Sequence, residues 1–173
     1  PLLPFFEVSA AYWQRYAQLP SIAPLASRHS RMLYHIKNAI VVFRQSSENG
    51  RISTEVRFGK TGSSSINFHD PWSNWRPYET LVLDLETPDY KPLPLTIRVH
   101  DEAHELGDQP HNDRFNRRIE LGPGRQAMKI SLDDIKNAPA GRDMDMKHID
   151  GLVLFGSGKE AGRRFLIHDV RLE

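Results

Sequence analysis

Apolar and polar residues alternate with a period of two along most of the chain, which is typical of β-strands that bury one face. The segment 80–86 places three leucines on one side, and the segment 95–100 does the same with Leu95, Ile97 and Val99. Nine such strands are predicted, over residues 39–45, 52–59, 64–69, 80–86, 95–100, 114–121, 127–132, 151–157 and 163–172. Nine short strands separated by Gly and Pro indicate an all-β fold, a sandwich or a barrel.

The first 38 residues have a different pattern. Apolar side chains recur at helical spacing from Val8 to Leu19, and Pro20 predicts the end of that helix because proline cannot continue it. A second short helix is predicted over 27–36. We therefore expect a helical N-terminal arm over 1–38 and a β-sandwich domain over 39–173. The arm is either a segment packed on the sandwich or a connector to a membrane.

Composition narrows the classes of function. The chain has 173 residues, enough for one domain with a sizeable core, and a formal net charge of +1. A net charge this small provides no general attraction for nucleic acid or for an anionic membrane surface. The absence of cysteine excludes disulfides, thiolate catalysis and cysteine-ligated zinc. Because the chain starts with proline, we expect it to be a fragment of a longer protein.

Three segments, 74–101, 112–135 and 144–173, together resemble a known bacterial domain. They are similar to the C-terminal extracytoplasmic jelly-roll domain of VanZ-like family membrane proteins, a sandwich like galactose-binding and carbohydrate-binding modules. The resemblance implies two antiparallel sheets, membrane helices upstream in the parent protein, and a location on the extracytoplasmic side of a bacterial membrane. It does not identify a ligand.

The stretch 98–118, RVHDEAHELGDQPHNDRFNRR, contains most of the candidate chemistry. Alternation places Thr96, Arg98 and His100 on the outer face of one strand. It places Arg114, Asn116 and Arg118 on the same face of the next strand, its predicted hairpin partner. Guanidinium and amide groups donate hydrogen bonds to sugar hydroxyls, carboxylates and phosphates. The predicted ligand-binding residues are Trp72, Arg98, His100, Asp101, Asp113, Arg114, Asn116 and Arg118.

Two other interpretations of this stretch stay open. In one, the polar side chains are structural: Asn112, Asp113 and Asn116 tie a flexible loop to backbone donors, and the outer face is an ordinary solvated one. In the other, the loop holds a metal ion. Zinc would use histidines and aspartates from the set His100, Asp101, His104, Asp108, His111 and Asp113, and calcium would use Asp101, Glu102, Asp108 and Asp113. The spacing matches no established metal signature, so no cofactor is predicted, although calcium is possible.

Catalysis is not predicted. The chain has no nucleophile elbow, P-loop or dinucleotide-binding glycine pattern, and the glycine-rich segment 155–163 is interpreted as a hairpin loop. Trp75 and Tyr78 are expected to close one end of the sandwich. The function expected is therefore a non-catalytic module that binds a cell-envelope carbohydrate, a polysaccharide or a similar polar ligand, fused to a membrane protein. The alternatives are a structural or protein-interaction domain and, third, a metal-dependent enzyme.

Overall fold

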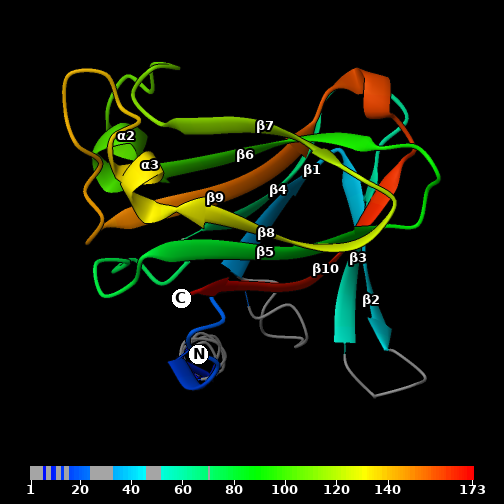
Figure 1. Cartoon of the computed structure of the whole chain (residues 1–173), viewed down its shortest axis with the longest axis horizontal. Helices are drawn as coiled ribbons and strands as arrows, with labels where there is room; N and C mark the ends of the chain where they lie inside the picture. The colour runs from blue at the N-terminus through cyan, green and yellow to red at the C-terminus, as the bar shows by residue number, and fades with distance from the viewer. Residues whose placement is uncertain are drawn as a thin grey trace.

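The protein is a sandwich of two five-stranded antiparallel sheets, seen face to face in Figure 1. This computed structural model describes residues 6, 9–10, 13, 16–23, 33–45, 52–69 and 71–173. The strands are β1 Tyr34–Lys37, β2 Ala39–Gln45, β3 Ile52–Phe58, β4 Ser64–His69, β5 Thr80–Thr87, β6 Leu93–Asp101, β7 Phe115–Leu121, β8 Gly124–Ser131, β9 Ile149–Gly156 and β10 Arg164–Leu172. The short helices are α2 Glu102–Leu106, α3 Leu132–Lys136 and the 3-10 helix η2 Gly158–Glu160.

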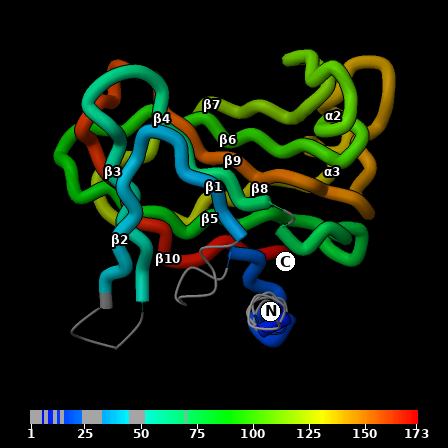
Figure 2. The backbone as a smooth tube through the Cα atoms, turned by 180° about the vertical axis from the view of Figure 1, so that it is seen from behind, coloured from blue at the N-terminus to red at the C-terminus, as the bar shows by residue number. Residues whose placement is uncertain are grey.

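The strand order is β1-β4-β9-β6-β7 in one sheet and β2-β3-β10-β5-β8 in the other. All the strand pairs are antiparallel, so the predicted antiparallel sandwich is confirmed. The first sheet lies behind the second in Figure 1 and can be followed from the opposite side in Figure 2. Each of the two sheets keeps one outer face, and these two faces are the surfaces on which a site can be built.

The core fills the space between the sheets with the inward residues of the alternating strands. Leu81, Leu83 and Leu85 of β5 are fully buried, as are Leu95 and Ile97 of β6 to within 1%. Each such side chain contributes about 1.5–3 kcal/mol through removal of apolar surface from water. The predicted parity of these strands therefore agrees with the structure.

One end of the sandwich is closed by Trp75, as expected. Its ring is fully buried, and its Nε1–H donates a hydrogen bond to the carbonyl of Pro71 at 3.2 Å. A buried indole needs such a partner for its single donor. Tyr78 packs against the same core from a partly buried position. Both residues are thus structural parts of the fold.

The N-terminal arm is docked on the sandwich. All described residues between positions 6 and 17 are helical, in agreement with the predicted first helix. After this helix, Ile22 is buried in the core and its N–H donates to the carbonyl of Val170 at 2.7 Å. None of the described helices combines the length and apolar character needed to cross a membrane.

The second predicted helix, over 27–36, is wrong at its C-terminal end. Tyr34–Lys37 form β1, which pairs in register with β4, so the described part of the chain contains ten strands where nine were predicted. A tertiary pairing outweighs local helical spacing here because the edge of β4 offers backbone partners along the whole segment. The earlier part of that prediction, over 27–32, lies outside the described residues.

The glycine-rich segment 155–163 is not a hairpin loop. It joins β9 of one sheet to β10 of the other and contains η2, whose first residue follows the N-capping Ser157. The Ser157 side chain accepts a hydrogen bond from the N–H of Lys159. Two strands joined by a short glycine-rich loop are not always paired, since a sandwich also needs connections that cross between its layers.

Candidate functional site

The predicted hairpin of β6 and β7 forms in the expected register. Arg98 lies opposite Asn116 and Thr96 lies opposite Arg118, with no bulge along the pairing. Most of the polar residues predicted to lie on the outer face therefore do so. Three of the eight predicted ligand-binding residues, however, are engaged elsewhere or covered.

His100 is on the outer face but is fully buried, contrary to the prediction that it is exposed. Its ring lies over Gly151 of β9, where a Cβ atom would come within 2.1 Å of Cε1. Helix α2 covers the side of the ring that faces away from the sheet. The ring of His104 has its centroid 5.3 Å away, and the Glu105 carboxylate approaches Nε2 to 3.2 Å. The predicted flexible loop contains this helix, which is why alternation alone misjudged the exposure of His100.

Burial also sets the charge of His100. Removal from water lowers its pKa to about 3, and the cations of Arg98 and Arg114 act in the same direction. The carboxylates of Glu105 and Asp150, 3.2 and 3.7 Å from Nε2, oppose this effect without reversing it. His100 is therefore neutral at physiological pH and supports the sheet rather than contributing a positive charge.

Asp101 and Asp113 are joined by Arg142 in an ion-pair cluster, which we call the Arg142 clasp. Nη1 and Nη2 of Arg142 donate to the Asp101 carboxylate at 2.6 and 2.8 Å, and Nε and Nη2 donate to Asp113 at 2.6 and 2.9 Å. Asp101 also accepts from the N–H groups of His104 and Asp145, and thereby caps α2. The ligand role predicted for Asp101 and Asp113 is thus replaced by a structural one.

The electrostatics of the clasp are consistent with this role. Burial acts to raise the pKa of Asp101, but hydrogen bonds from Arg142 and from two backbone N–H groups hold it below its ordinary value. The Arg142 hydrogen bond likewise lowers the pKa of Asp113, and the two carboxylates raise the pKa of Arg142. All three groups are therefore charged at neutral pH and hold the ends of the 101–113 loop to residues 142–145.

The predicted metal set does not assemble, because Arg142 occupies two of its carboxylates. Among the described residues, the group close enough to share an ion is His100, Glu105 and Asp150, whose ligand atoms lie within 4.8 Å of one another. One imidazole and two carboxylates do not resemble the six to eight oxygen atoms that calcium prefers. The donor set therefore does not fit calcium.

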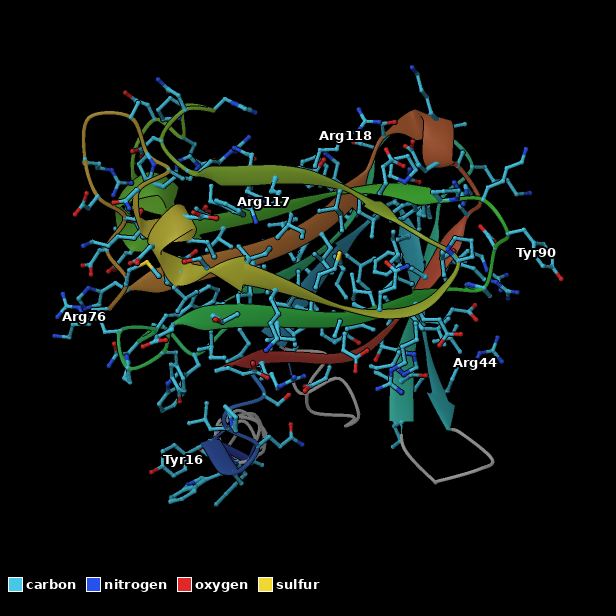
Figure 3. All side chains as sticks on the ribbon, viewed as in Figure 1. Tyr16, Arg44, Arg76, Tyr90, Arg117 and Arg118 are labelled. Atoms are coloured by element: carbon cyan, nitrogen blue, oxygen red, sulfur yellow. The ribbon has the colours of Figure 1, made fainter. Side chains whose placement is uncertain are left out.

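Arg117 has the same strand parity as the buried residues Phe115 and Leu121, and the pairing of β7 with β6 runs through it without a bulge. Its guanidinium lies 5.3 Å from the centre of the Phe115 ring and reaches past the edge of the sheet to Asp134 of α3, at 2.7 Å. Arg117 and Arg118 are both labelled on β7 in Figure 3. An edge strand allows this arrangement because it has no further neighbour to cover the side chain.

A cleft of about 410 Å³ lies on the outer face of the β1-β4-β9-β6-β7 sheet, and we call it the sheet-face cleft. The volume is within the range of about 300–1,000 Å³ that is common for ligand sites. Its lining residues are His35, Lys37, Ser63, Ser64, Ser65, Asn67, His69, Arg98, Arg114, Val153 and Phe155. Two of the predicted residues, Arg98 and Arg114, belong to this set.

Strand register explains why these residues meet. Asn67 of β4 lies opposite Val153 of β9, which in turn lies opposite Arg98 of β6. One row further, Ser65 lies opposite Phe155. Strand β9 therefore forms a floor with two apolar side chains. The walls are the polar residues of β1 and β4 on one side and the two arginines on the other.

Several polar atoms of the cleft are buried without a hydrogen-bond partner. These are Oδ1 of Asn67, Nε of Arg98 and Nε of Arg114. The amide nitrogen of Asn67, by contrast, lies 3.2 Å from Nε2 of His69. Because a buried polar atom without a partner costs about 1–3 kcal/mol, three such atoms around one cleft indicate a surface prepared for a ligand.

The remaining predicted residues lie outside this cleft. The Asn116 amide nitrogen donates to the carbonyl of His111 at 3.3 Å, so it contacts a backbone acceptor and not the backbone donor that the structural interpretation expected; its Oδ1 is buried and unpaired. Arg118 is 72% exposed and lies 3.9 Å from Glu120. Trp72 is partly buried against the core, with its ring 5.7 Å from that of Tyr16 in the N-terminal helix. A ligand role for these three residues stays a prediction.

The other wall of the cleft was not predicted. His35 was assigned to the incorrect helix over 27–36, and Lys37 to the N-terminal arm over 1–38. Asn67 and His69 are on a correctly predicted strand, 64–69, but nothing in the sequence shows that β4 and β9 separate β1 from β6. The signal that could have found them is the alternation SSINFH, which places two polar side chains on one face.

Comparison with known proteins identifies the architecture. No protein-family model and no curated protein matches the chain. A family 11 carbohydrate-binding module from Clostridium thermocellum, solved with a β-1,3-1,4-mixed-linked tetrasaccharide, matches with a TM-score of 0.59 and 14% identity over 82% of this chain and 88% of that one. A family 30 module of a C. thermocellum cellulosomal cellulase matches with a TM-score of 0.59 and 11% identity, over 82% and 91%.

A third similar structure is an exo-β-agarase, with a TM-score of 0.63 and 14% identity over 82% of this chain. The match covers 23% of the agarase, so it concerns one part of a much longer enzyme. At these identities the likeness is one of fold. The chain has the jelly-roll sandwich that carbohydrate-binding modules have, which confirms the predicted fold class.

Proposed function

We propose that this protein is a non-catalytic carbohydrate-binding module whose ligand lies in the sheet-face cleft. The observation that carries the proposal is the convergence of buried, unpartnered polar atoms from Asn67, Arg98 and Arg114 on one cleft. A sugar chain offers hydroxyl groups that donate to Asn67 Oδ1 and oxygen atoms that accept from the arginines. The similarity in fold to carbohydrate-binding modules supports the same proposal.

The lining of the cleft favours binding over hydrolysis. Glycoside hydrolases generally place two carboxyl groups on either side of the bond they cleave. None of the residues that line the cleft is an aspartate or a glutamate. A sugar held there is bound by donors, acceptors and an apolar floor, without an acid and a base to act on it.

The cleft proposal is tested by binding measurements on a panel of soluble polysaccharides, both neutral and acidic. Asn67→Ala removes an acceptor from the cleft and is expected to weaken binding of whichever polysaccharide binds the wild type. Arg76→Gln, at a 63% exposed residue of the 71–79 loop, is the control and should bind normally. If the wild type binds no polysaccharide, or if Asn67→Ala binds as well as the control, the cleft is not a glycan site.

We also propose that the module is attached to a membrane protein of the VanZ-like family and faces the extracytoplasmic side. The support is the sequence resemblance over 74–101, 112–135 and 144–173. The test is the accessibility of a single cysteine, introduced as Tyr90→Cys at a 98% exposed position, to a membrane-impermeant thiol reagent in intact cells. Labelling only after cell lysis would contradict the proposed location.

A second candidate function is protein interaction through the N-terminal helix. Trp13 and Tyr16 are 73% and 59% exposed, although large aromatic rings are normally buried, and their ring centroids are 6.4 Å apart. Tyr16 is labelled at the lower edge of the molecule in Figure 3. Trp13→Ser should abolish association with the parent membrane region without changing glycan binding; unchanged association would remove this candidate.

A further inference from the structure

The charges in the sheet-face cleft are all of one sign. Lys37, Arg98 and Arg114 line it, and no carboxylate does. Neither guanidinium makes a hydrogen bond or ion pair with a residue that the structure describes, and Nε of each is buried. Every other arginine that the structure describes has a carboxylate oxygen within 4 Å of one of its nitrogen atoms. Among the arginines that the structure describes, Arg98 and Arg114 are therefore the two without a carboxylate partner, and both line this cleft.

The two arginines also face each other. Arg98 lies opposite Asn116, so Arg114, two residues earlier on the same side, is its diagonal neighbour across β6 and β7. Burial lowers the pKa of both guanidinium groups, and Arg114 lowers that of Arg98 further. Glu105 acts in the opposite direction on Arg98, but its carboxylate lies against His100. Two adjacent, half-buried cations are unfavourable until an anion lies between them.

The cleft has little of the chemistry that recognises a neutral sugar chain. Neutral sugars are held largely by stacking of their apolar faces on tryptophan and tyrosine rings. The lining contains neither, and its one aromatic floor residue is the half-buried Phe155. The exposed rings of Trp13 and Tyr16 belong to the N-terminal helix and do not line the cleft.

We infer that the ligand of the sheet-face cleft is an anionic polysaccharide, with a carboxylate or sulfate group held between Arg98 and Arg114. This inference rests on the proposed function and specifies its ligand class. The planar forks of the two guanidinium groups match the oxygen atoms of such anions. Lys37 adds a third positive charge from the opposite wall, and Asn67 is left to accept from a sugar hydroxyl. The net charge of +1 means that attraction for the anion is local to this cleft.

The test uses affinity electrophoresis and calorimetry with four probes: polygalacturonate, a sulfated galactan, neutral agarose and neutral mixed-linkage β-glucan. We expect one or both acidic polymers to bind, and the two acidic arms distinguish carboxylate from sulfate. Raising the salt from 50 to 300 mM should weaken that binding several-fold, because the charges attract each other across partly solvated distances. The neutral polymers should bind at least tenfold more weakly.

Substitutions of the cleft arginines test whether the cleft is responsible for the preference for acidic polymers. Arg98→Gln and Arg114→Gln should each weaken binding of the acidic polymer about ten- to hundredfold, as expected for loss of a charged hydrogen-bond donor. Arg98→Lys keeps the charge without the fork and should fall between these variants and the wild type. Arg76→Gln, at a 63% exposed arginine outside the cleft, is the control. A melting temperature no lower than that of the wild type shows that each variant is folded.

The outcomes separate this inference from the proposed function. If a neutral polysaccharide binds tightly, with no salt dependence and with Arg98→Gln harmless while Asn67→Ala is damaging, the anionic ligand is wrong and the carbohydrate site stands. If an acidic polymer binds but Arg76→Gln weakens it as much as Arg98→Gln, the attraction is not specific to the cleft and the inference fails. If the wild type binds none of the four polymers, both are overturned.

Discussion

The two outer faces of the sandwich use the same kinds of residues in different ways. On the β2-β3-β10-β5-β8 face, Glu55 is only 4% exposed and lies within 4 Å of Arg44, Arg57 and Arg164, of which Arg44 is labelled in Figure 3. Asp84 of the same face receives two hydrogen bonds from Arg125, at 2.8 and 2.6 Å. Charge on this face is matched within the protein.

On the β1-β4-β9-β6-β7 face, Arg98 and Arg114 have no such carboxylates among the described residues. The amide oxygens of Asn67 and Asn116 are also unpaired there. Since both faces are polar and arginine-rich, composition alone does not identify a binding surface. Among the described residues, the β1-β4-β9-β6-β7 face differs in that several of its buried polar atoms have no partner within the protein, and this difference supports the proposed binding surface.

The largest effect is expected outside both faces, at the Arg142 clasp that holds the end of the β6–β7 hairpin. Arg142→Ala leaves the fully buried Asp101 carboxylate without its cation and should lower the free energy of unfolding by about 3–5 kcal/mol. Denaturant unfolding monitored by tryptophan fluorescence measures this. Arg76→Ala, at a 63% exposed arginine 3.7 Å from Asp145, should change stability by less than about 0.5 kcal/mol. Equal effects of the two variants would mean that the clasp is an ordinary surface pair.

A smaller loss of stability is expected on the β2-β3-β10-β5-β8 face, where the charged groups are paired. Glu55→Gln removes the charge that three arginines share and should cost about 1–3 kcal/mol, less than the clasp because those arginines are half exposed and can be solvated. The control is Glu120→Gln, at a 58% exposed residue on the edge strand β7. A Glu55 variant as stable as this control would remove the distinction drawn between the two faces.

His100, on the β1-β4-β9-β6-β7 face, should make the free energy of unfolding depend on pH. Its folded pKa of about 3 is below the unfolded value of about 6.5, so the unfolded chain binds more protons below that pH. Stability is therefore complete above pH 6.5 and is lost as the pH falls toward 3, by at most about 1.4 kcal/mol per pH unit.

The measurement for His100 is the slope of the unfolding free energy between pH 6.5 and 5, above the range in which Asp101 and Asp113 titrate in the unfolded chain. His100→Gln should have a smaller slope, whatever its absolute stability. Parallel slopes for the variant and the wild type would mean that His100 is not the group responsible.

The smallest effect is expected in the cleft itself. Arg98→Gln removes one of two adjacent, unpaired cations, so the free energy of unfolding should stay the same or rise by up to about 1 kcal/mol. This is the opposite of the result expected for Glu55→Gln. Loss of more than about 1 kcal/mol in chemical denaturation would show that Arg98 has a stabilising partner.

Much of this organisation was predictable from the sequence. Alternation gave the bounds of β2 and β4 correctly, and it placed Arg98 and Asn116 on the same face of the β6–β7 hairpin. These features depend on residues close in sequence, whose period of two decides which side chains share a face. Half of the cleft, the arginine wall, could therefore be predicted.

The other half depends on contacts between distant residues. Strand β1 takes its structure from β4, about thirty residues away, and the Arg142 clasp joins residues 29 and 41 positions apart. The predicted outward direction of His100 was correct, but the exposure of its side chain depends on two other elements. Helix α2 covers the ring, and Gly151, which has no side chain, leaves room for the ring against the sheet. The alternation of apolar and polar residues does not predict the order of the strands in a sheet, and it does not predict which cation pairs with which carboxylate.

The central claim, that the sheet-face cleft binds an anionic sugar chain, is tested most directly by following the arginine Nε–H resonances during titration, first with oligogalacturonate and then with a sulfated galactan oligosaccharide. We predict that the signals of Arg98 and Arg114 shift with saturation, while those of Arg125 and Arg142, which already have carboxylate partners, do not move. Shifts confined to other arginines, or no shifts at all, would contradict the account.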